Sequence, residues 1–220
     1  MTSNFKNPNF KLENPTSKIQ LPKSKLENPK SKLLRVVVIA SSAGGIAALT
    51  EILSRLPAGL PASVLIVQHL RSNRQTRLSE LLTRISPMPV CMAKEGLLLE
   101  AGRIFIARPG SHLSIEKNAL HLSLEEPKNY VRPSADVLFS SAAHALGPLV
   151  IGVILSGTGR DGALGCQNIK SKGGVTICQD EKTSRYFAMP RAAVDMEAID
   201  YVLPLKEIAG KIVEIMEIGD

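Results

Sequence analysis

Three short, almost wholly apolar segments constrain the fold of this chain more than any other feature. They read RVVVIA, SVLIVQ and LVIGVIL and lie at residues 35–40, 63–68 and 149–155. Runs of aliphatic and β-branched residues of this length are typical of strands that are buried on both faces. A helical pattern follows each of them, and strands that alternate with helices build a parallel sheet covered on both sides. The sequence therefore predicts an α/β fold with a doubly wound, mostly parallel sheet.

The remaining pattern supplies further elements around this sheet. Apolar residues at helical spacing predict helices at 45–56, 77–85, 134–147, 189–196 and 205–216, and one that ends near Lys170. Shorter apolar runs predict strands at 89–93, 103–107 and 174–179. Residues 112–124 alternate about Lys117 and Asn118, which indicates a small inserted β-hairpin. Ser134 stands where a helix N-cap is expected, and Gly147 stands just past the end of the same helix.

The first 34 residues differ from the rest in composition. They are rich in Asn, Pro, Lys and Ser and contain a near-repeat, KLENPTSK at 11–18 and KLENPKSK at 25–32. Because they hold few large apolar residues, we expect residues 1–34 to form a disordered basic tail and residues 35–220 to form the folded domain. Residues 1–35 carry eight Lys and Arg residues and two Glu, hence +6 of the formal net charge of +7. The body is therefore nearly neutral, which argues against nucleic acid as its main partner.

Cysteine content and hydropathy predict where in the cell the protein is located. Cys91, Cys166 and Cys178 are widely spaced and odd in number, without a C-x-x-C pair. Burial as small apolar residues in a reducing compartment is their expected state. No apolar run approaches the ~20 residues that span a membrane, and the N-terminus lacks the apolar segment of a signal peptide. We therefore expect a cytoplasmic protein without a transmembrane segment.

Chemically capable side chains follow the three apolar strands. The first strand ends in Ser41 and Ser42, the second in Gln68 and His69, and the loop SGTGRDG after the third carries Asp161. The carboxyl ends of parallel strands share one edge of the sheet, where sites form in such folds. Serine, histidine and aspartate together can perform nucleophilic acyl transfer, because histidine takes the serine proton and a carboxylate orients the imidazole.

Of the two adjacent serines, Ser42 fits a nucleophile better. A nucleophile on a sharp strand-to-helix turn needs small residues two positions before and after it. Ala40 and Gly44 meet this requirement for Ser42, whereas Ile39 is too bulky to meet it for Ser41. The N–H groups that begin the following helix would provide an oxyanion site. We expect Ser41 instead to cap a backbone N–H or to line the cleft.

Each of these residues also has an ordinary structural interpretation. A serine at a strand–helix junction is often a helix N-cap, a single histidine is often structural, and Asp161 could cap the helix after GTGRDG. A dinucleotide site is disfavoured because SSAGG lacks the G-x-G-x-x-G spacing. A metal site is disfavoured because the other histidines lack metal-ligand spacing; they are His112, His121 and His144. Three complementary groups at three strand ends nevertheless favour catalysis.

Several motifs, in order along the chain, resemble one known family. They are IASSAGGIAAL, VLIVQHL, IFIARPGSHL, VRPSADVLFSSAA, GVILSGTGRDGALG and FAMPRAAV. Over residues 35–218 the chain resembles the catalytic domain of the chemotaxis protein-glutamate methylesterase (CheB) family. The resemblance implies that Ser42 is the nucleophile, His69 the base and Asp161 the carboxylate of the triad.

The resemblance also implies a reaction and its partners. It implies a hydrolase that demethylates glutamate γ-methyl esters on chemoreceptor helices, releases methanol and also deamidates glutamines, with no cofactor and no metal. Oxyanion or substrate-binding roles would fall on Ala43, Thr158 and Gly159. The family commonly has Thr in place of Ala43 and Met in place of Thr158, so that backbone N–H roles would survive here and side-chain roles would not. The tail is too short for the receiver domain that usually precedes this domain, which leaves control by a separate response regulator or histidine kinase open.

More than one class of function remains open at this point. The first is a serine methylesterase in chemotaxis adaptation, in which Arg71, Arg74 and Arg77 would attract Glu-rich receptor helices. A solvated basic helix face explains these arginines equally well. The second is a catalytically weak or inactive scaffold of the same fold in a sensory pathway, and a third is a serine hydrolase for another ester.

Overall fold

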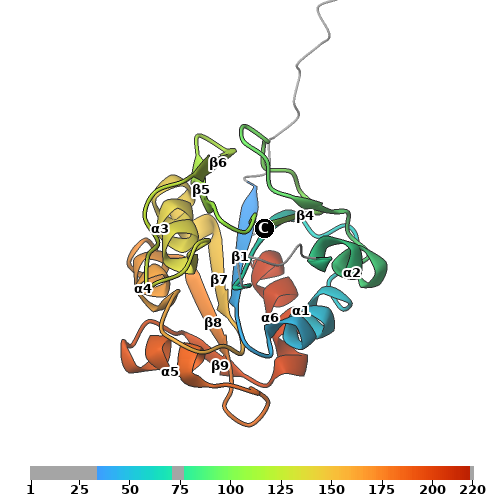
Figure 1. Cartoon of the computed structure of the whole chain (residues 1–220). Coiled ribbons are helices and arrows are strands. Elements are labelled where there is room, and N and C mark those ends of the chain that lie inside the picture. Colours follow the sequence, from blue (N-terminus) through green and yellow to red (C-terminus); the bar gives the residue numbers. More distant parts are fainter. Residues whose placement is uncertain (1–33, 71–76, 219–220) are drawn as a thin grey trace, which may run out of the picture. The chain divides into compact units, whose positions relative to one another are not determined.

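A seven-stranded sheet forms the middle of the part of the chain that the computed structural model describes, residues 34–70 and 77–218 (Figure 1). Every neighbouring pair of strands in it is parallel. The strand order is β3 (Val90–Met92), β4 (Arg103–Ile106), β2 (Ala62–Gln68), β1 (Arg35–Ser41), β7 (Val150–Ile154), β8 (Val175–Gln179) and β9 (Tyr201–Leu203). The chain thus winds outward from β1 in both directions, as in a doubly wound α/β fold.

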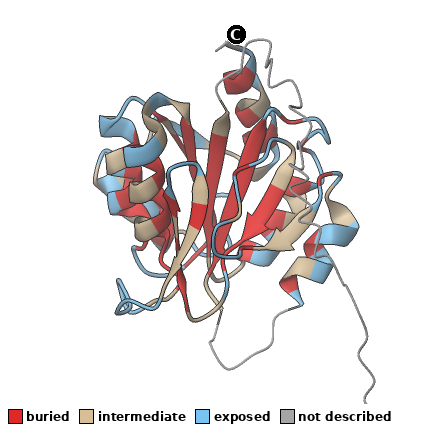
Figure 2. Ribbon diagram, turned by 90° about the horizontal axis from the view of Figure 1, so that it is seen from above, coloured by how far each residue is buried: buried red, intermediate tan, exposed pale blue. Residues whose placement is uncertain are grey.

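The described helices cover both faces of the sheet. α1 (Gly45–Leu53), α2 (Leu78–Ile85) and α6 (Leu205–Ile218) pack on one face, and α3 (Ala135–Leu146), α4 (Ala163–Ser171) and α5 (Ala188–Asp195) pack on the other. Successive residues of a strand point to opposite faces. Val37 and Ile39 of β1 accordingly pack with the first group of helices, and Val36 and Val38 with the second. Figure 2 shows these buried strands between the two layers, which confirms the predicted fold class.

The predicted hairpin is also present. β5 (His112–Glu116) and β6 (Ala119–Ser123) pair in antiparallel register, and Lys117 and Asn118 between them have positive φ angles of 48° and 65°. The N–H of Ile115 donates to Oγ of Ser141, which attaches the hairpin to α3. A short 3₁₀ helix, Gly147–Leu149, links α3 to β7.

Apart from shifts of a residue or so at element ends, the structure differs from the sequence-based expectation at one helix end and one strand. The helix predicted at 45–56 ends at Leu53, because the N–H of Arg55 bonds the carbonyl of Ile52, three residues back rather than four. The strand β9 was not predicted, since it has three residues of which the first two are exposed. Gly147 follows α3 as expected, with a φ of 53°.

The structure tests several other sequence-based expectations only in part. The tail predicted at 1–34 lies outside the described residues, apart from Leu34. Cys166 and Cys178 are buried as predicted, while Cys91 is half-buried. Of the helices that the structure describes, none is long and apolar enough to cross a membrane. In the described ranges no group of His, Cys, Asp and Glu side chains is arranged to hold a metal ion.

Candidate active site

The residues singled out at the ends of β1, β2 and β7 meet at one edge of the sheet. The register pairs Ser41 with Gln68 and Ala40 with Ile154, so the three strands end at the same level. The N–H of His69 donates to the carbonyl of Ser41 at 2.9 Å. Just beyond β7, the carbonyl of Ser156 accepts from the N–H of Ser42 at 3.0 Å. Backbone pairing therefore places Ser42 and His69 beside the loop that carries Asp161.

The turn after Ser42 leaves no room for larger side chains. Gly44 has a φ of 76°, and a Cβ there would lie 2.7 Å from Oγ of Ser156. A Cβ on Gly157 would lie 2.9 Å from Cβ of Ser42. Both distances are too short for real contacts. Glycine is therefore required at position 44, in the turn after Ser42, and at position 157, in the loop that packs against Ser42. The small-residue requirement inferred for Ser42 therefore has a steric cause, and Gly157 extends it to a residue that sequence reasoning missed.

Ser41 has a different role from the one expected. Its side chain is fully buried, and its Oγ donates to Oε1 of Gln68 at 2.6 Å. The expectation that Ser41 caps a backbone N–H or lines the cleft is therefore wrong. The side chain points into the structure because β1 alternates, and the amide of the paired residue in β2 is within reach. Nε2 of Gln68 in turn donates to the carbonyls of Ser42 and His69, at 2.9 and 3.0 Å.

The imidazole of His69 bonds to the carboxylate of Asp161. The distance from Nε2 to Oδ2 is 2.9 Å, and the two side chains are 10% and 4% exposed. With Nε2 engaged, Nδ1 is the ring nitrogen left to accept a proton. Among the described residues no hydrogen bond joins Oγ of Ser42 to His69; such bonds are often long before substrate binds.

The Asp161 carboxylate is surrounded by hydrogen-bond donors. Besides His69, it accepts from Oγ of Ser134 at 2.6 Å, from Nδ2 of Asn129 at 3.1 Å, and from the N–H groups of Ala135 and Asp136. Burial on its own raises the pKa of Asp161, but the hydrogen bonds from His69, Ser134 and Ala135 outweigh it and the pKa lies below its ordinary value. The group is therefore held as an anion beside the imidazole.

These contacts revise two interpretations from the sequence. Ser134 occupies the N-cap position of α3, yet its hydroxyl bonds Asp161 and no helix N–H. Asp161 does not cap α4, whose N-cap is Gly162. It instead accepts the first N–H groups of α3, a helix from another part of the chain. Sequence spacing gives no sign of this pairing, because it depends on how α3 packs.

A second carboxylate, Asp136, fixes the loop that carries Asp161. Its Oδ1 accepts from the N–H groups of Gly162 and Gly165 at 2.9 and 2.8 Å, and its Oδ2 accepts from Nδ2 of Asn129 at 2.6 Å. Burial raises the pKa of Asp136, and the nearby charge of Asp161 adds to this effect. Asn129 thus bridges both carboxylates, and sequence reasoning identified neither Asn129 nor Asp136.

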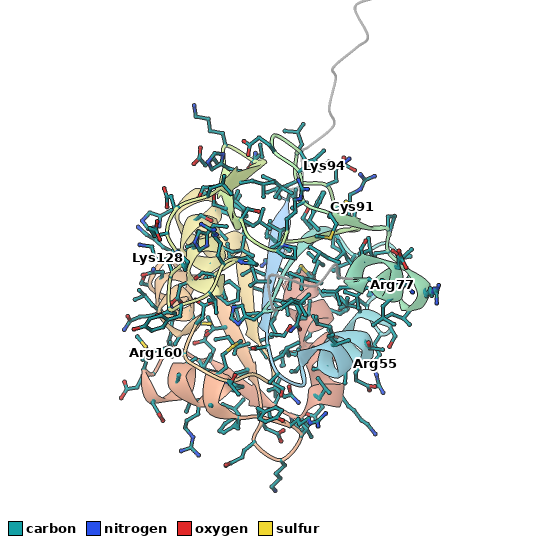
Figure 3. All side chains as sticks on the ribbon, in the orientation of Figure 1. Arg55, Arg77, Cys91, Lys94, Lys128 and Arg160 are labelled. Atoms are coloured by element: carbon teal, nitrogen blue, oxygen red, sulfur yellow. The ribbon has the colours of Figure 1, made fainter. Side chains whose placement is uncertain are left out.

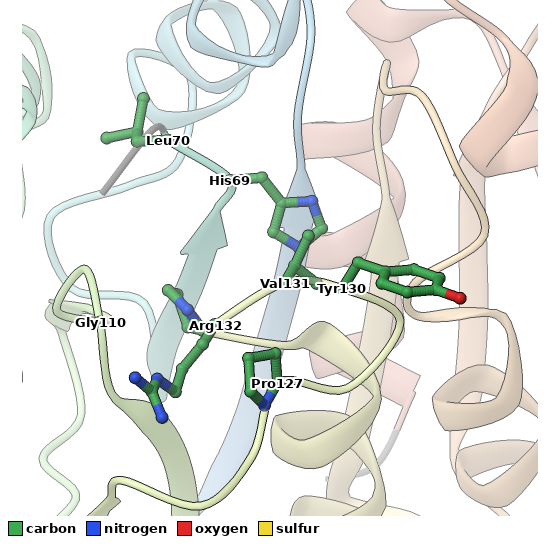
Figure 4. Close-up of a pocket in the computed structure, with 8 residues that line it drawn as sticks. His69, Leu70, Gly110, Pro127, Tyr130, Val131 and Arg132 are labelled. Carbon is green, nitrogen blue, oxygen red and sulfur yellow. The ribbon is translucent and has the colours of Figure 1, made fainter. Parts of the chain in front are cut away.

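A cavity of about 330 Å³ opens beside His69 (Figure 4). The segment from Pro127 to Pro133 supplies most of its wall, including Tyr130 and Arg132, and Gly110 lies opposite. The guanidinium of Arg132 donates to the carbonyls of Leu124 and Glu125, both at 2.8 Å, and so holds this segment. A substrate group of moderate size can therefore approach the imidazole.

Comparison with known proteins identifies the family and the fold. Residues 37–212 match the family model described as CheB methylesterase. The chain belongs to the CheB methylesterase family. A crystal structure of the Thermotoga maritima CheB methylesterase catalytic domain matches with a TM-score of 0.79 and 33% sequence identity, over 83% of this chain and 98% of that one.

Curated CheB relatives are longer than this chain. The protein-glutamate methylesterase/protein-glutamine glutaminase 2 of Anaeromyxobacter dehalogenans is 44% identical over 175 residues, 80% of this chain and 51% of that protein. The Pyrococcus horikoshii protein-glutamate methylesterase/protein-glutamine glutaminase is 38% identical over 186 residues, 83% of this chain and 50% of that protein. The chain therefore spans about half the length of the curated CheB relatives it matches, and the predicted resemblance is confirmed.

Ala43 and Thr158, at which the resemblance implies departures from the family's common residues, lie on two turns. The carbonyl of Ala43 accepts from Oγ of Ser156 at 2.8 Å, which ties the first turn to the end of β7. Thr158 and Gly159 are exposed in the second turn, and Gly159 has a φ of 89°. In the described part of the chain no backbone hydrogen bond occupies the N–H of Ala43, Thr158 or Gly159.

The remaining histidines make structural hydrogen bonds, and the arginines of the expected docking surface are only partly described. His112 is buried and bonds the N–H of Ser134 and the carbonyl of Glu126, so it supports the residue that contacts Asp161. His121 pairs with Glu95, and His144 bonds the carbonyl of Ser140. Of the arginines proposed as a docking surface, Arg71 and Arg74 lie outside the described residues, and Arg77 is exposed at the start of α2.

Proposed function

We propose that this chain is a serine hydrolase that demethylates glutamate γ-methyl esters on chemoreceptor proteins, and deamidates glutamines there, in chemotaxis adaptation. The 2.9 Å pair of His69 and Asp161, beside the Ser42 turn, is the observation that carries the proposal. The names of these relatives describe the same two activities. The proposal places the enzyme in the cytoplasm.

The reaction follows from the roles that this edge of the sheet supports. Oγ of Ser42 attacks the carbonyl carbon of the ester while Nδ1 of His69 accepts the hydroxyl proton. The bond from that carbon to the methoxy oxygen breaks, and the leaving group takes the proton from His69 and departs as methanol. Water then attacks the glutamyl-serine ester with the same base, which frees Ser42 and leaves a glutamate carboxylate. A glutamine side chain loses ammonia in place of methanol.

The surrounding groups assist these steps without chemistry of their own. Asp161 remains an anion, orients the imidazole through Nε2 and stabilises its protonated form. The N–H groups of Ala43, Thr158 and Gly159 are the oxyanion and substrate-binding donors in this proposal. Backbone donors do not depend on the side chain, so the Ala43 and Thr158 departures are compatible with activity. The proposed chemistry uses no cofactor and no metal.

Exposed cations near the site fit an acidic helical substrate. Arg160 precedes Asp161, and Lys128 precedes Asn129, which bonds Asp161. Both side chains project on the side of α3 and α4, whereas Arg77 lies beside α2 (Figure 3). Within the described residues neither Arg160 nor Lys128 forms an ion pair, so their charge is available to a partner. Such cations accelerate encounter with a Glu-rich receptor helix.

Methanol release from a labelled receptor tests the proposal. The full chain is incubated with a chemoreceptor protein that carries radiolabelled methyl groups on glutamates, and volatile methanol is counted. We expect release by the wild type and a loss of at least about 100-fold in His69→Gln, the usual cost of removing a general base. His144→Gln is the matched control, since His144 is exposed on α3 and bonds only its own helix, to the carbonyl of Ser140.

Three results would contradict the proposal. Equal release by the wild type and His69→Gln would remove the histidine from the mechanism. No release by the wild type, together with no hydrolysis of a small ester, would favour the scaffold interpretation. Hydrolysis of the small ester alone would favour a different ester substrate.

A further inference from the structure

The wall of the cavity beside His69 contains a tight turn at residues 128–131. The N–H of Val131 donates to the carbonyl of Lys128 at 2.9 Å. The two residues between them, Asn129 and Tyr130, both have left-handed backbones, with φ angles of 52° and 64°. Two positive φ angles and this hydrogen bond define a type I′ turn.

Tyrosine is an unfavourable residue at this place in the turn. The second central position of a type I′ turn favours glycine, because a Cβ crowds the backbone when φ is positive. Tyr130 gains no packing in compensation, since its relative exposure is 102%. Strained residues of this kind cluster at functional sites, where the surrounding structure holds them in place. The side chain therefore has no role in the fold that would explain it.

The turn is held firmly against the candidate triad. Nδ2 of Asn129 donates to Asp136 at 2.6 Å and to Asp161 at 3.1 Å. Tyr130, the next residue, lines the same cavity as His69 (Figure 4). The backbone that carries the ring is thus held at the cavity wall, one residue from a side chain that bonds the proposed orienting carboxylate.

We infer that Tyr130 is a substrate-contact residue that recognises the polypeptide carrying the ester and not the ester itself. A glutamyl side chain that approaches His69 through this cavity would carry its own backbone at the rim, where the exposed ring lies. An aromatic ring offers a large apolar contact to a side chain one helical turn from the ester. The inference rests on the proposed function, because it names a determinant of substrate choice at the same site.

Three variants of Tyr130 separate recognition from structure. Tyr130→Phe retains the ring, Tyr130→Ala removes it and keeps a Cβ, and Tyr130→Gly removes it and relieves the backbone. With a methyl-labelled chemoreceptor fragment, we expect kcat/KM to fall by about tenfold in the Ala and Gly variants, the loss typical of truncating an aromatic anchor. The Phe variant should match the wild type. With p-nitrophenyl acetate, all three should stay within about twofold of the wild type, because a small ester does not reach the ring.

Tyr130→Gly should lower activity on the receptor fragment but raise the stability of the fold. Tyr130→Gly is expected to raise the melting temperature, since glycine adopts a positive φ without crowding. Tyr201→Ala is the control, because this partly exposed tyrosine on β9 does not line the cavity. It should leave turnover of both substrates unchanged.

The outcomes distinguish this inference from the proposed function. If the wild type releases methanol and Tyr130→Ala does so with unchanged kcat/KM, the inference alone is overturned. It is also overturned if Tyr130→Ala loses activity equally on both substrates, which would show that the turn merely supports Asp161. If the wild type releases no methanol from the receptor fragment, the proposed function and the inference fall together.

Discussion

Oγ of Ser41 donates a 2.6 Å hydrogen bond to Oε1 of Gln68, between the last residues of the two central strands. This bond sets the orientation of the amide, so that Nε2 points to the carbonyls of Ser42 and His69. Both side chains are buried. The first of two adjacent serines therefore helps to hold the backbone on which the second serine and the histidine stand.

The Gln68 amide should matter for both turnover and stability. Gln68→Leu keeps a similar volume but leaves the Ser41 hydroxyl and two carbonyls without their partner. Unpaired buried polar groups cost about 1–3 kcal/mol each, so three of them should lower the free energy of unfolding by at least about 3 kcal/mol. Turnover should fall by about tenfold as Ser42 and His69 lose their fixed spacing. Denaturant unfolding and methanol release measure the two effects.

Ser41→Ala should reduce stability and turnover less than Gln68→Leu does. It removes one partner of Oε1 of Gln68, for about 1–2 kcal/mol, and leaves the two Nε2 bonds in place. Most turnover should remain. Ser54→Ala, at an exposed serine after α1, is the control and should change stability by less than about 0.5 kcal/mol. A larger loss of activity in Ser41→Ala than in Gln68→Leu would contradict these roles for the two side chains.

Acid should weaken the fold through Asp161. Hydrogen bonds overcome the effect of burial and hold the pKa of Asp161 below that of the unfolded chain. The ionised group therefore stabilises the native state above the unfolded pKa, and this contribution is lost as pH falls through the lower, native pKa. Asp161→Asn should be less stable than the wild type at neutral pH, and the difference should shrink in acid. Melting temperatures of both proteins between pH 7 and pH 3 test this, and a difference that grows in acid would contradict it.

Gly44 should tolerate no side chain. In Gly44→Ala the new methyl group would lie 2.7 Å from Oγ of Ser156 and 2.9 Å from Cβ of Arg185, on a residue with a φ of 76°. Crowding and the left-handed backbone together should cost about 3 kcal/mol and displace Ser42. Gly59→Ala is the matched control, since no atom lies within 4 Å of a Cβ there. Equal stability of the two variants would show that the Ser42 turn is looser than described.

The elements that can be predicted from sequence are those with a local signal. The apolar runs of β1, β2 and β7 mark buried strands, and parallel strands end at one edge, so the sequence alone is enough to bring Ser42, His69 and the Asp161 loop together. The small residues around Ser42 carry a local signal as well. Steric distances at Gly44 and Gly157 explain that signal physically.

The residues that hydrogen-bond Asp161 cannot be predicted from local sequence signals. Asn129, Ser134 and Asp136 contact it across more than 20 positions of sequence, and those contacts depend on how α3 packs against the loop after β7. Ser134 even carries a misleading local signal, since a serine before a helix ordinarily caps it. The role expected for Ser41 was wrong for a similar reason: its partner, Gln68, is a neighbour across the sheet and not along the chain.

The identity of the nucleophile is tested most directly by a serine-directed phosphonate on the full chain. Mass spectrometry of the digested protein locates the adduct, and methanol release is measured in parallel for Ser42→Ala and Ser41→Ala. We expect an adduct on Ser42, almost complete loss of release in Ser42→Ala with a residual ~10³-fold over water, and substantial release in Ser41→Ala. An adduct on Ser41, or full activity in Ser42→Ala, would contradict the assignment of Ser42 as the nucleophile.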